Sequence, residues 1–199
     1  MIPVLILAAG QSSRMRGTDK LMCYVHGFPL LRHQIDMAAG IGPIYVALPS
    51  DNHPRLAALC GTAAIPLIVP QASEGIGGTM RGAVAQLPDC YAFMIVLGDL
   101  ISLTNNDLEG ILNTKNTHKK NLIWRGATPD GKPGHPIIFD ASLRPAFASL
   151  HGDSGGESIV KPLASQTHLH RFNDNRARHD LDTPEDWSAW QSQLDRQLP

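Results

Sequence analysis

The residues best suited to chemistry follow the first apolar segment of the chain. Residues 2–7 are apolar and predict a strand buried on both faces, and Gly10 and Ser12 lie in the loop directly after it. Small residues let main-chain N–H groups approach an anion closely. Arg14 and Lys20 add positive charge to the same loop. This combination predicts a binding site for a triphosphate.

Two carboxylates occupy positions that suit a metal site. Asp99 follows the most apolar run of the chain, residues 91–97, and Asp182 lies just before the helix-capping sequence 183–186. A carboxylate at the carboxyl end of a central strand can hold a divalent cation against phosphate oxygens. Asp99 could instead have a turn or helix-capping role. Asp182 could instead simply precede the cap and bind no ligand.

A second glycine cluster spans residues 75–82 and leads into a helical pattern. The N–H groups at such a helix start can hold an anion or the edge of a nucleobase, which makes Gly77, Gly78 and Thr79 candidates. A tight strand-to-helix turn is the alternative. His135 precedes another apolar run and could pair with a phosphate, because histidine titrates near neutral pH, although a lone histidine in a turn usually has a structural role.

Alternating strands and helices must position these residues. Strands are predicted at 2–7, 44–48, 66–69, 91–97, 121–124, 134–139 and 166–172, and helices at about 29–39, 54–59, 80–87, 105–115, 143–150 and from 184 onward. The pattern predicts an α/β fold with three layers, α/β/α, around a mostly parallel sheet. Ligands of such sheets bind at the carboxyl edge of the strands.

Composition bounds the class of protein. A chain of 199 residues with 43% hydrophobic residues can bury one core, so we expect a single domain. Lys and Arg number 17 against 18 Asp and Glu, which argues against nucleic acid as the main partner. No apolar run reaches the length of a membrane span, and the start of the chain lacks signal-peptide features, so we expect a cytoplasmic protein without a membrane partner.

The first loop resembles a known family. The string LAAGQSSRMRGTDKL contains neither GxxxxGK[ST] nor GxGxxG, but it resembles the LAAGxSxRMGxxK signature of the MobA-like nucleotidyltransferases, which attach a nucleotide to the pterin of the molybdenum cofactor. Three later stretches resemble family motifs as well, namely residues 74–82, residues 98–101 with Ile101 in place of a proline, and residues 180–187. Residues 152–157 resemble a fourth motif, with Glu157 in place of an arginine.

The resemblance implies roles for individual residues. It implies a Rossmann-like nucleotidyltransferase domain over residues 1–199, in which 1–100 mainly bind the nucleoside triphosphate and 101–199 mainly bind the acceptor. The nucleotide would contact Leu7, Ala8, Ala9, Gly10, Ser12, Gly77, Gly78 and Thr79. Arg14, Lys20 and Asp99 would be catalytic, Asp99 and Asp182 would hold Mg²⁺, and His135 and Asp153 would bind the acceptor.

The resemblance also implies substrates. Family members with LAAG after the first strand favour CTP, and a methyl group at Ala9 would crowd the space that a purine uses. The acceptor would be molybdopterin, and a molybdoenzyme or its chaperone would be the recipient. A sugar phosphate or alditol phosphate acceptor stays open. A non-catalytic carrier of a nucleotide or pterin is the alternative from another class, and the departures at Ile101 and Glu157 are its support.

Overall fold

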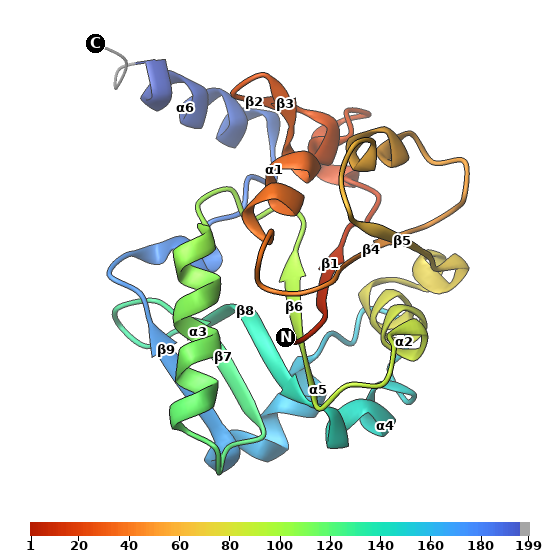
Figure 1. Cartoon of the computed structure of the whole chain (residues 1–199). Coiled ribbons are helices and arrows are strands. Elements are labelled where there is room, and N and C mark those ends of the chain that lie inside the picture. The colour runs from red at the N-terminus through yellow and green to blue at the C-terminus, as the bar shows by residue number, and fades with distance from the viewer. Residues whose placement is uncertain (196–199) are drawn as a thin grey trace.

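The computed structural model describes residues 1–195, and residues 196–199, the end of the predicted domain 1–199, lie outside this part. Seven strands form one sheet in the order β5-β4-β1-β6-β8-β7-β9 (Figure 1). They are β1 (Val4–Leu7), β4 (Ile44–Leu48), β5 (Ile65–Ile68), β6 (Ala92–Leu97), β7 (Ile123–Ala127), β8 (Pro133–Asp140) and β9 (Thr167–Arg171). β8 runs antiparallel to β6 and β7, and the other pairings in this sheet are parallel.

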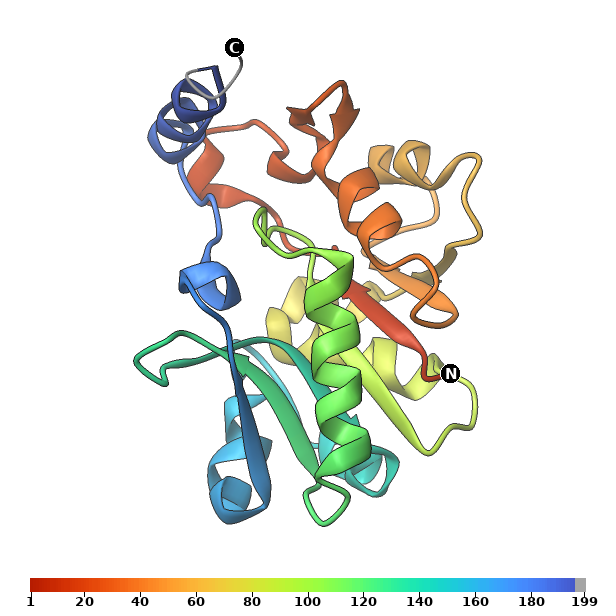
Figure 2. The same ribbon diagram turned by 60° about the vertical axis from the view of Figure 1, so that its left-hand side comes forward.

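Helices cover both faces of the sheet (Figures 1 and 2). They are α1 (Leu30–Met37), α2 (Ile76–Gln86), α3 (Asn105–Thr117), α4 (Arg144–Phe147), α5 (Glu157–Val160) and α6 (Pro184–Asp195). Alternate residues of the strands enter two separate cores: in β1, Val4 and Ile6 pack with α1 and α3, whereas Leu5 and Leu7 pack with α2, α4 and α5. The predicted three-layer α/β/α fold with a mostly parallel sheet is confirmed.

Helix starts follow their capping residues. Thr104 and Asp107 form a reciprocal capping box at the start of α3, and Thr183 and Asp186 exchange the same hydrogen bonds before α6. α6 lies beside a small hairpin of β2 (Tyr24–Val25) and β3 (Phe28–Pro29) (Figure 2). This contact brings the last described helix next to the first thirty residues of the chain.

Several elements differ in detail from the sequence prediction. Residues 54–59 form a 3-10 helix instead of an α-helix, and α5 lies where no helix was predicted. β7 spans Ile123–Ala127 instead of the predicted 121–124, because Arg125 is paired with Glu157 inside the fold and the strand extends into residues expected to form a turn-rich loop. Within residues 1–195, the helices are too short or too polar to cross a membrane.

Candidate active site

The loop after β1 and the carboxylate after β6 meet at one edge of the sheet. Leu7 pairs with Leu97 in parallel register, and the Gly98 N–H donates to the Leu7 carbonyl over 3.0 Å. Both strands therefore end at the same level, as predicted from their order. The first loop and Asp99 consequently face the same space.

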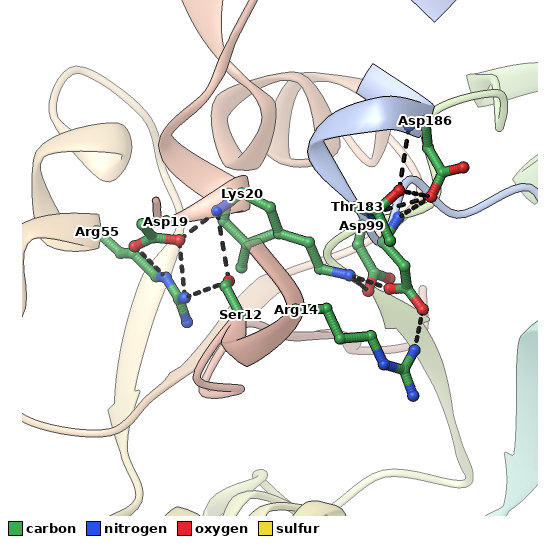
Figure 3. Close-up of polar contacts among 10 residues, drawn as sticks. Ser12, Arg14, Asp19, Lys20, Arg55, Asp99, Thr183 and Asp186 are labelled. Atoms are coloured by element: carbon green, nitrogen blue, oxygen red, sulfur yellow. Dashed lines mark hydrogen bonds and ion pairs between the residues drawn. The ribbon is translucent and has the colours of Figure 1, made fainter. Parts of the chain in front are cut away.

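Lys20 lies between two carboxylates at this edge (Figure 3). Its Nζ is 2.6 Å from Oδ2 of Asp99 and 2.7 Å from Oδ1 of Asp182, and Arg14 forms an ion pair with the other oxygen of Asp182. The structure thus brings together four residues that the sequence placed in three separate motifs. The Lys20 and Asp99 side chains are largely buried, whereas Arg14 is mostly exposed.

Each charge of this cluster stabilises the ionised form of its oppositely charged neighbours. Burial acts to lower the pKa of Lys20, but the adjacent Asp99 and Asp182 outweigh it and raise the pKa above its ordinary value. Burial acts to raise the pKa of Asp182, and hydrogen bonds and charge from Lys20 and Arg14 outweigh it and lower that pKa. Lys20 is therefore a fixed cation and Asp182 a fixed anion at neutral pH.

The donor set fits a divalent cation. Asp99 Oδ1 is buried and accepts no hydrogen bond from any residue that the structure describes, which leaves a hard oxygen available. Across residues 1–195 no three His, Cys, Asp or Glu side chains cluster as a complete metal cage. Asp99 and Asp182 would thus supply part of a coordination shell, and substrate oxygens and water would supply the rest.

Arg55 holds the first loop in shape. This arginine is 2% exposed, and its Nε and Nη2 each lie 2.8 Å from an oxygen of Asp19 (Figure 3). Its Nη1 donates to the Ala8 carbonyl over 2.6 Å, and Nη2 donates to Ser12 Oγ over 3.3 Å. Arg55 was not predicted from the sequence, because it lies in a separate element and no motif marks it.

Two neighbouring cavities open at this edge. One, of about 240 Å³, is lined by Gly10, Ser12 and Arg14 together with the Lys20 cluster. The other, of about 460 Å³, shares Leu7, Gly10 and Asp99 with the first and extends to Ala9, Glu74, Gly75, Thr79 and Asp153. Ala8 lines neither, since its side chain is buried and its carbonyl is held by Arg55.

The second glycine cluster is a packing contact as well as a cavity wall. The Gly77 N–H donates to the Gly152 carbonyl over 2.8 Å, and a Cβ at Gly77 would lie 2.7 Å from the His151 carbonyl oxygen. A Cβ at Gly78 would lie 2.1 Å from the Gln71 carbonyl oxygen. Gly77 and Gly78 are buried and do not line the two cavities, whereas Gly75 and Thr79 do.

The two predicted acceptor residues lie in different cavities. Asp153 faces the cavity that contains Ala9 and Thr79, while His135 lines a third cavity of about 250 Å³ with Arg125 and Glu157. Burial, followed by the charge of Arg125, lowers the pKa of His135 to about 4, so its ring is neutral at pH 7. The resemblance assigned both residues to the acceptor, and the sequence alone does not separate these two surroundings.

A comparison with known families gives the class of this chain. The model of the MobA-like NTP transferase domain matches residues 4–170. The chain belongs to this family. The assignment confirms the family suspected from the first loop, and it makes nucleotidyl transfer from a nucleoside triphosphate the reaction class of this MobA-like transferase.

Solved structures share the fold at low identity. Rv0371c from Mycobacterium tuberculosis H37Rv is 23% identical, with 96% of this chain and 97% of that chain covered and a TM-score of 0.79. A structure of the same protein in complex with manganese is 22% identical, with 94% and 96% covered and a TM-score of 0.71. CMP:2-keto-3-deoxy-manno-octonic acid synthetase complexed with CTP is 15% identical, with 100% of both chains covered and a TM-score of 0.74.

One curated relative matches by sequence. The bifunctional protein GlmU of Halorhodospira halophila (strain DSM 244 / SL1) is 29% identical over 113 residues, which are 56% of this chain and 24% of GlmU. The matched stretch spans about a quarter of that relative, so the match concerns one part of GlmU.

Proposed function

We propose that this MobA-like transferase moves a cytidylyl group from CTP to a phosphate on an acceptor, and that the acceptor is molybdopterin carrying molybdenum. An oxygen of the acceptor phosphate attacks the α-phosphorus of CTP. The bond from that phosphorus to the oxygen shared with the β-phosphate breaks, and pyrophosphate leaves with the bonding electrons. The protein's task is to position two anions and to offset their charge.

The Lys20 cluster is the observation that carries this proposal. Lys20 and Arg14 place two cations at a cavity whose floor is formed by Gly10 and Ser12, where a triphosphate would meet main-chain N–H groups. Both cations are held by carboxylates, which keeps them in position before substrate arrives. Lys20 would then offset charge on the β- and γ-phosphates as pyrophosphate forms.

Asp99 and Asp182 would hold Mg²⁺ in this proposal. The free Oδ1 of Asp99 supports the assignment, and the manganese complex of a protein with the same fold is consistent with it. When bound, the ion supplies charge neutralisation at phosphate oxygens. Asp99 and Asp182 themselves fix where that charge lies relative to Lys20.

Cytosine is the base that we propose for the larger cavity. Ala9 lines this cavity together with Gly75 and Thr79, and a methyl group at this position would leave less space for a purine than a glycine would. A protein with the same fold is known in complex with CTP. The acceptor would lie on the side of His135, and Asp153 would lie nearer the nucleotide than the sequence alone indicated.

A nucleotide panel tests the donor. We expect CTP with Mg²⁺ to raise the melting temperature more than GTP, UTP or ATP, since a ligand stabilises the native state in proportion to the logarithm of its concentration over Kd. Asp99→Asn should abolish the Mg²⁺-dependent part of the shift, and Asp130→Asn, at an exposed surface pair with Lys132, should leave it unchanged. A larger shift with GTP would refute the choice of base.

Turnover separates the enzyme from a carrier. With CTP, Mg²⁺ and molybdopterin we expect pyrophosphate release that Asp99→Asn lowers by about two orders of magnitude or more. Sugar phosphates and alditol phosphates form the second arm of the assay, and faster release with either would replace molybdopterin as the acceptor. Tight CTP binding without release with any acceptor would favour a carrier.

A further inference from the structure

A buried arginine faces the third cavity with one nitrogen unused. Arg125 in β7 is 4% exposed, its Nε donates to the Gly134 carbonyl over 3.2 Å, and its Nη1 donates to Glu157 Oε1 over 2.7 Å. Its Nη2 makes no hydrogen bond to any part of residues 1–195. This nitrogen is not among the fully enclosed polar atoms that lack a partner, so its N–H groups stay open to the cavity that Arg125 lines and can donate to a ligand.

A second unpaired group lies in the same cavity. Nδ1 of His135 is buried and has no partner among the residues described. Both groups line the cavity of about 250 Å³, together with apolar surface from Leu97 and Leu100 and with the exposed Arg178. Arg125 offers an open N–H edge and His135 a ring nitrogen without a partner, and a few polar groups in a cavity with apolar walls are typical of a ligand site.

The cavity is adjacent to the nucleotide side. Leu97 lines this cavity as well as the one that contains Ala9 and Thr79, and Asp99 follows two residues later on the same strand. The charge of Asp99 also acts on the His135 ring. A group bound at Arg125 would therefore lie beside the place where the α-phosphate of a nucleotide is expected.

We propose that this cavity binds the phosphate monoester of the acceptor, with Arg125 as its principal cation and His135 Nδ1 as a further hydrogen-bonding group. The proposal rests on the proposed function and names the residues that bind its second substrate. Arg125 presents a planar edge of N–H donors that matches phosphate oxygens. Arg178, whose Nη1 donates to the Pro133 carbonyl over 2.8 Å, adds a second positive charge at the rim, and the exposed Asp180 adds a negative charge there.

Glu157 is a positioning residue in this arrangement. It occupies the place where the family motif has an arginine, so the positive charge of the site comes from β7 instead of from this loop. The Glu157 carboxylate accepts a hydrogen bond from Nη1 of Arg125 over 2.7 Å and so restrains the guanidinium in the cavity wall. It also places a negative charge near the bound phosphate, which opposes binding.

Inorganic phosphate is the probe for this site. The full chain is first saturated with α,β-methylene-CTP and Mg²⁺, which fills the proposed triphosphate site without turnover, and phosphate is then titrated in a calorimeter. Arg125→Gln should weaken phosphate binding by about tenfold or more, because a charged hydrogen bond is lost. Glu157→Gln keeps an acceptor for Nη1 but removes the charge, and should strengthen binding by about threefold.

The control is Arg171→Gln, at an exposed residue of β9, which should leave phosphate binding unchanged. Acetate should bind more weakly than phosphate, because the site is proposed for a dianion. If acetate binds as tightly as phosphate, the specificity for a phosphate monoester is overturned. If Arg125→Gln lowers the melting temperature but leaves phosphate binding as in the wild type, Arg125 is structural and the inference is overturned. If the nucleotide analogue itself does not stabilise the wild type, the proposed function fails instead.

Discussion

The Lys20 ammonium lies at the position that we propose for the divalent cation. Its ammonium lies within 2.7 Å of oxygens from both Asp99 and Asp182, the two proposed metal ligands. A divalent cation bound between the same carboxylates would be repelled by this ammonium. Entry of a metal would therefore require Lys20 to move toward the triphosphate.

Replacement of Lys20 by methionine tests this competition. We expect Lys20→Met to bind Mn²⁺ about tenfold more tightly in the absence of nucleotide, because a positive charge is removed from the site. The same variant should lose most nucleotidyl transfer. Electron paramagnetic resonance of free Mn²⁺ measures the first effect, with Lys132→Met as the matched control; weaker Mn²⁺ binding in Lys20→Met would contradict the prediction.

His135 predicts an acid-dependent loss of stability. Its pKa is about 4 in the folded protein against 6.5 in the unfolded chain, so between these values the unfolded chain binds a proton that the native state does not. The free energy of unfolding should therefore fall as pH decreases through this window, by up to about 3 kcal/mol from this group, and no further below it. Urea unfolding of wild type and His135→Asn at about pH 7 and about pH 4.5 measures the difference; equal losses in both proteins would exclude His135 as the cause.

The sequence identified the cations and carboxylates of the site but not the arginines that organise it. Arg14, Lys20, Asp99 and Asp182 stand in ordered motifs, and the parallel pairing of β1 with β6 is enough to bring the first two motifs together. Asp182 joins them through the segment before α6, where Leu100 and Asp180 form an isolated antiparallel bridge. The partners of Arg55 and Arg125 lie 36 and 32 residues away in sequence. No local pattern of residue types encodes such a pairing.

At the scale of elements, strands were predicted better than short helices. β4 has the predicted bounds, and β6 begins one residue later than expected, because continuous apolar runs are typical of strands buried on both faces. α5, with four residues, and the 3-10 helix at 54–59 are fixed mainly by contacts with other elements. Their sequences contain too few turns for a periodic pattern.

The start of α2 depends on a glycine. A Cβ at Gly77 would meet backbone oxygens of His151 and Gly152 at 2.7 and 2.9 Å, and backbone cannot move aside as a flexible side chain does. We expect Gly77→Ala to lower the free energy of unfolding by about 2 to 3 kcal/mol. Gly155→Ala is the matched control, since its Cβ would have an ordinary contact at 3.8 Å with Ile76 Cγ2. Chemical denaturation measures both, and similar losses would contradict the role assigned to Gly77.

At the scale of the whole molecule, the site joins both ends of the described chain. Arg14 and Asp182 are 168 residues apart in sequence, and α6 begins directly after Asp182 and Thr183. Trp187, 5% exposed, anchors α6 in the core that also contains residues of α1 and α3. The position of Asp182 therefore depends on packing outside the cavity.

Substitutions at Trp187 test this dependence. Trp187→Ala should lower the free energy of unfolding by about 3 to 5 kcal/mol and weaken Mn²⁺ binding, since α6 loses its anchor. Trp187→Phe keeps an aromatic ring and removes an indole N–H that has no partner within residues 1–195, so its effect should be smaller. Calorimetric unfolding and Mn²⁺ titration measure the two effects, and full Mn²⁺ affinity in Trp187→Ala would refute the coupling.

The antiparallel direction of β8 allows acceptor specificity to change separately from the nucleotide site. Because β8 runs against β6, its first residues, with His135 among them, reach the rim where β1 and β6 end. A hybrid that exchanges residues 123–140 with those of another family member would replace Arg125 and His135 together and keep Asp153 of the nucleotide cavity. It would leave the pairing of Leu7 with Leu97 untouched. Such a graft should change which acceptor is recognised while the same nucleoside triphosphate is still used.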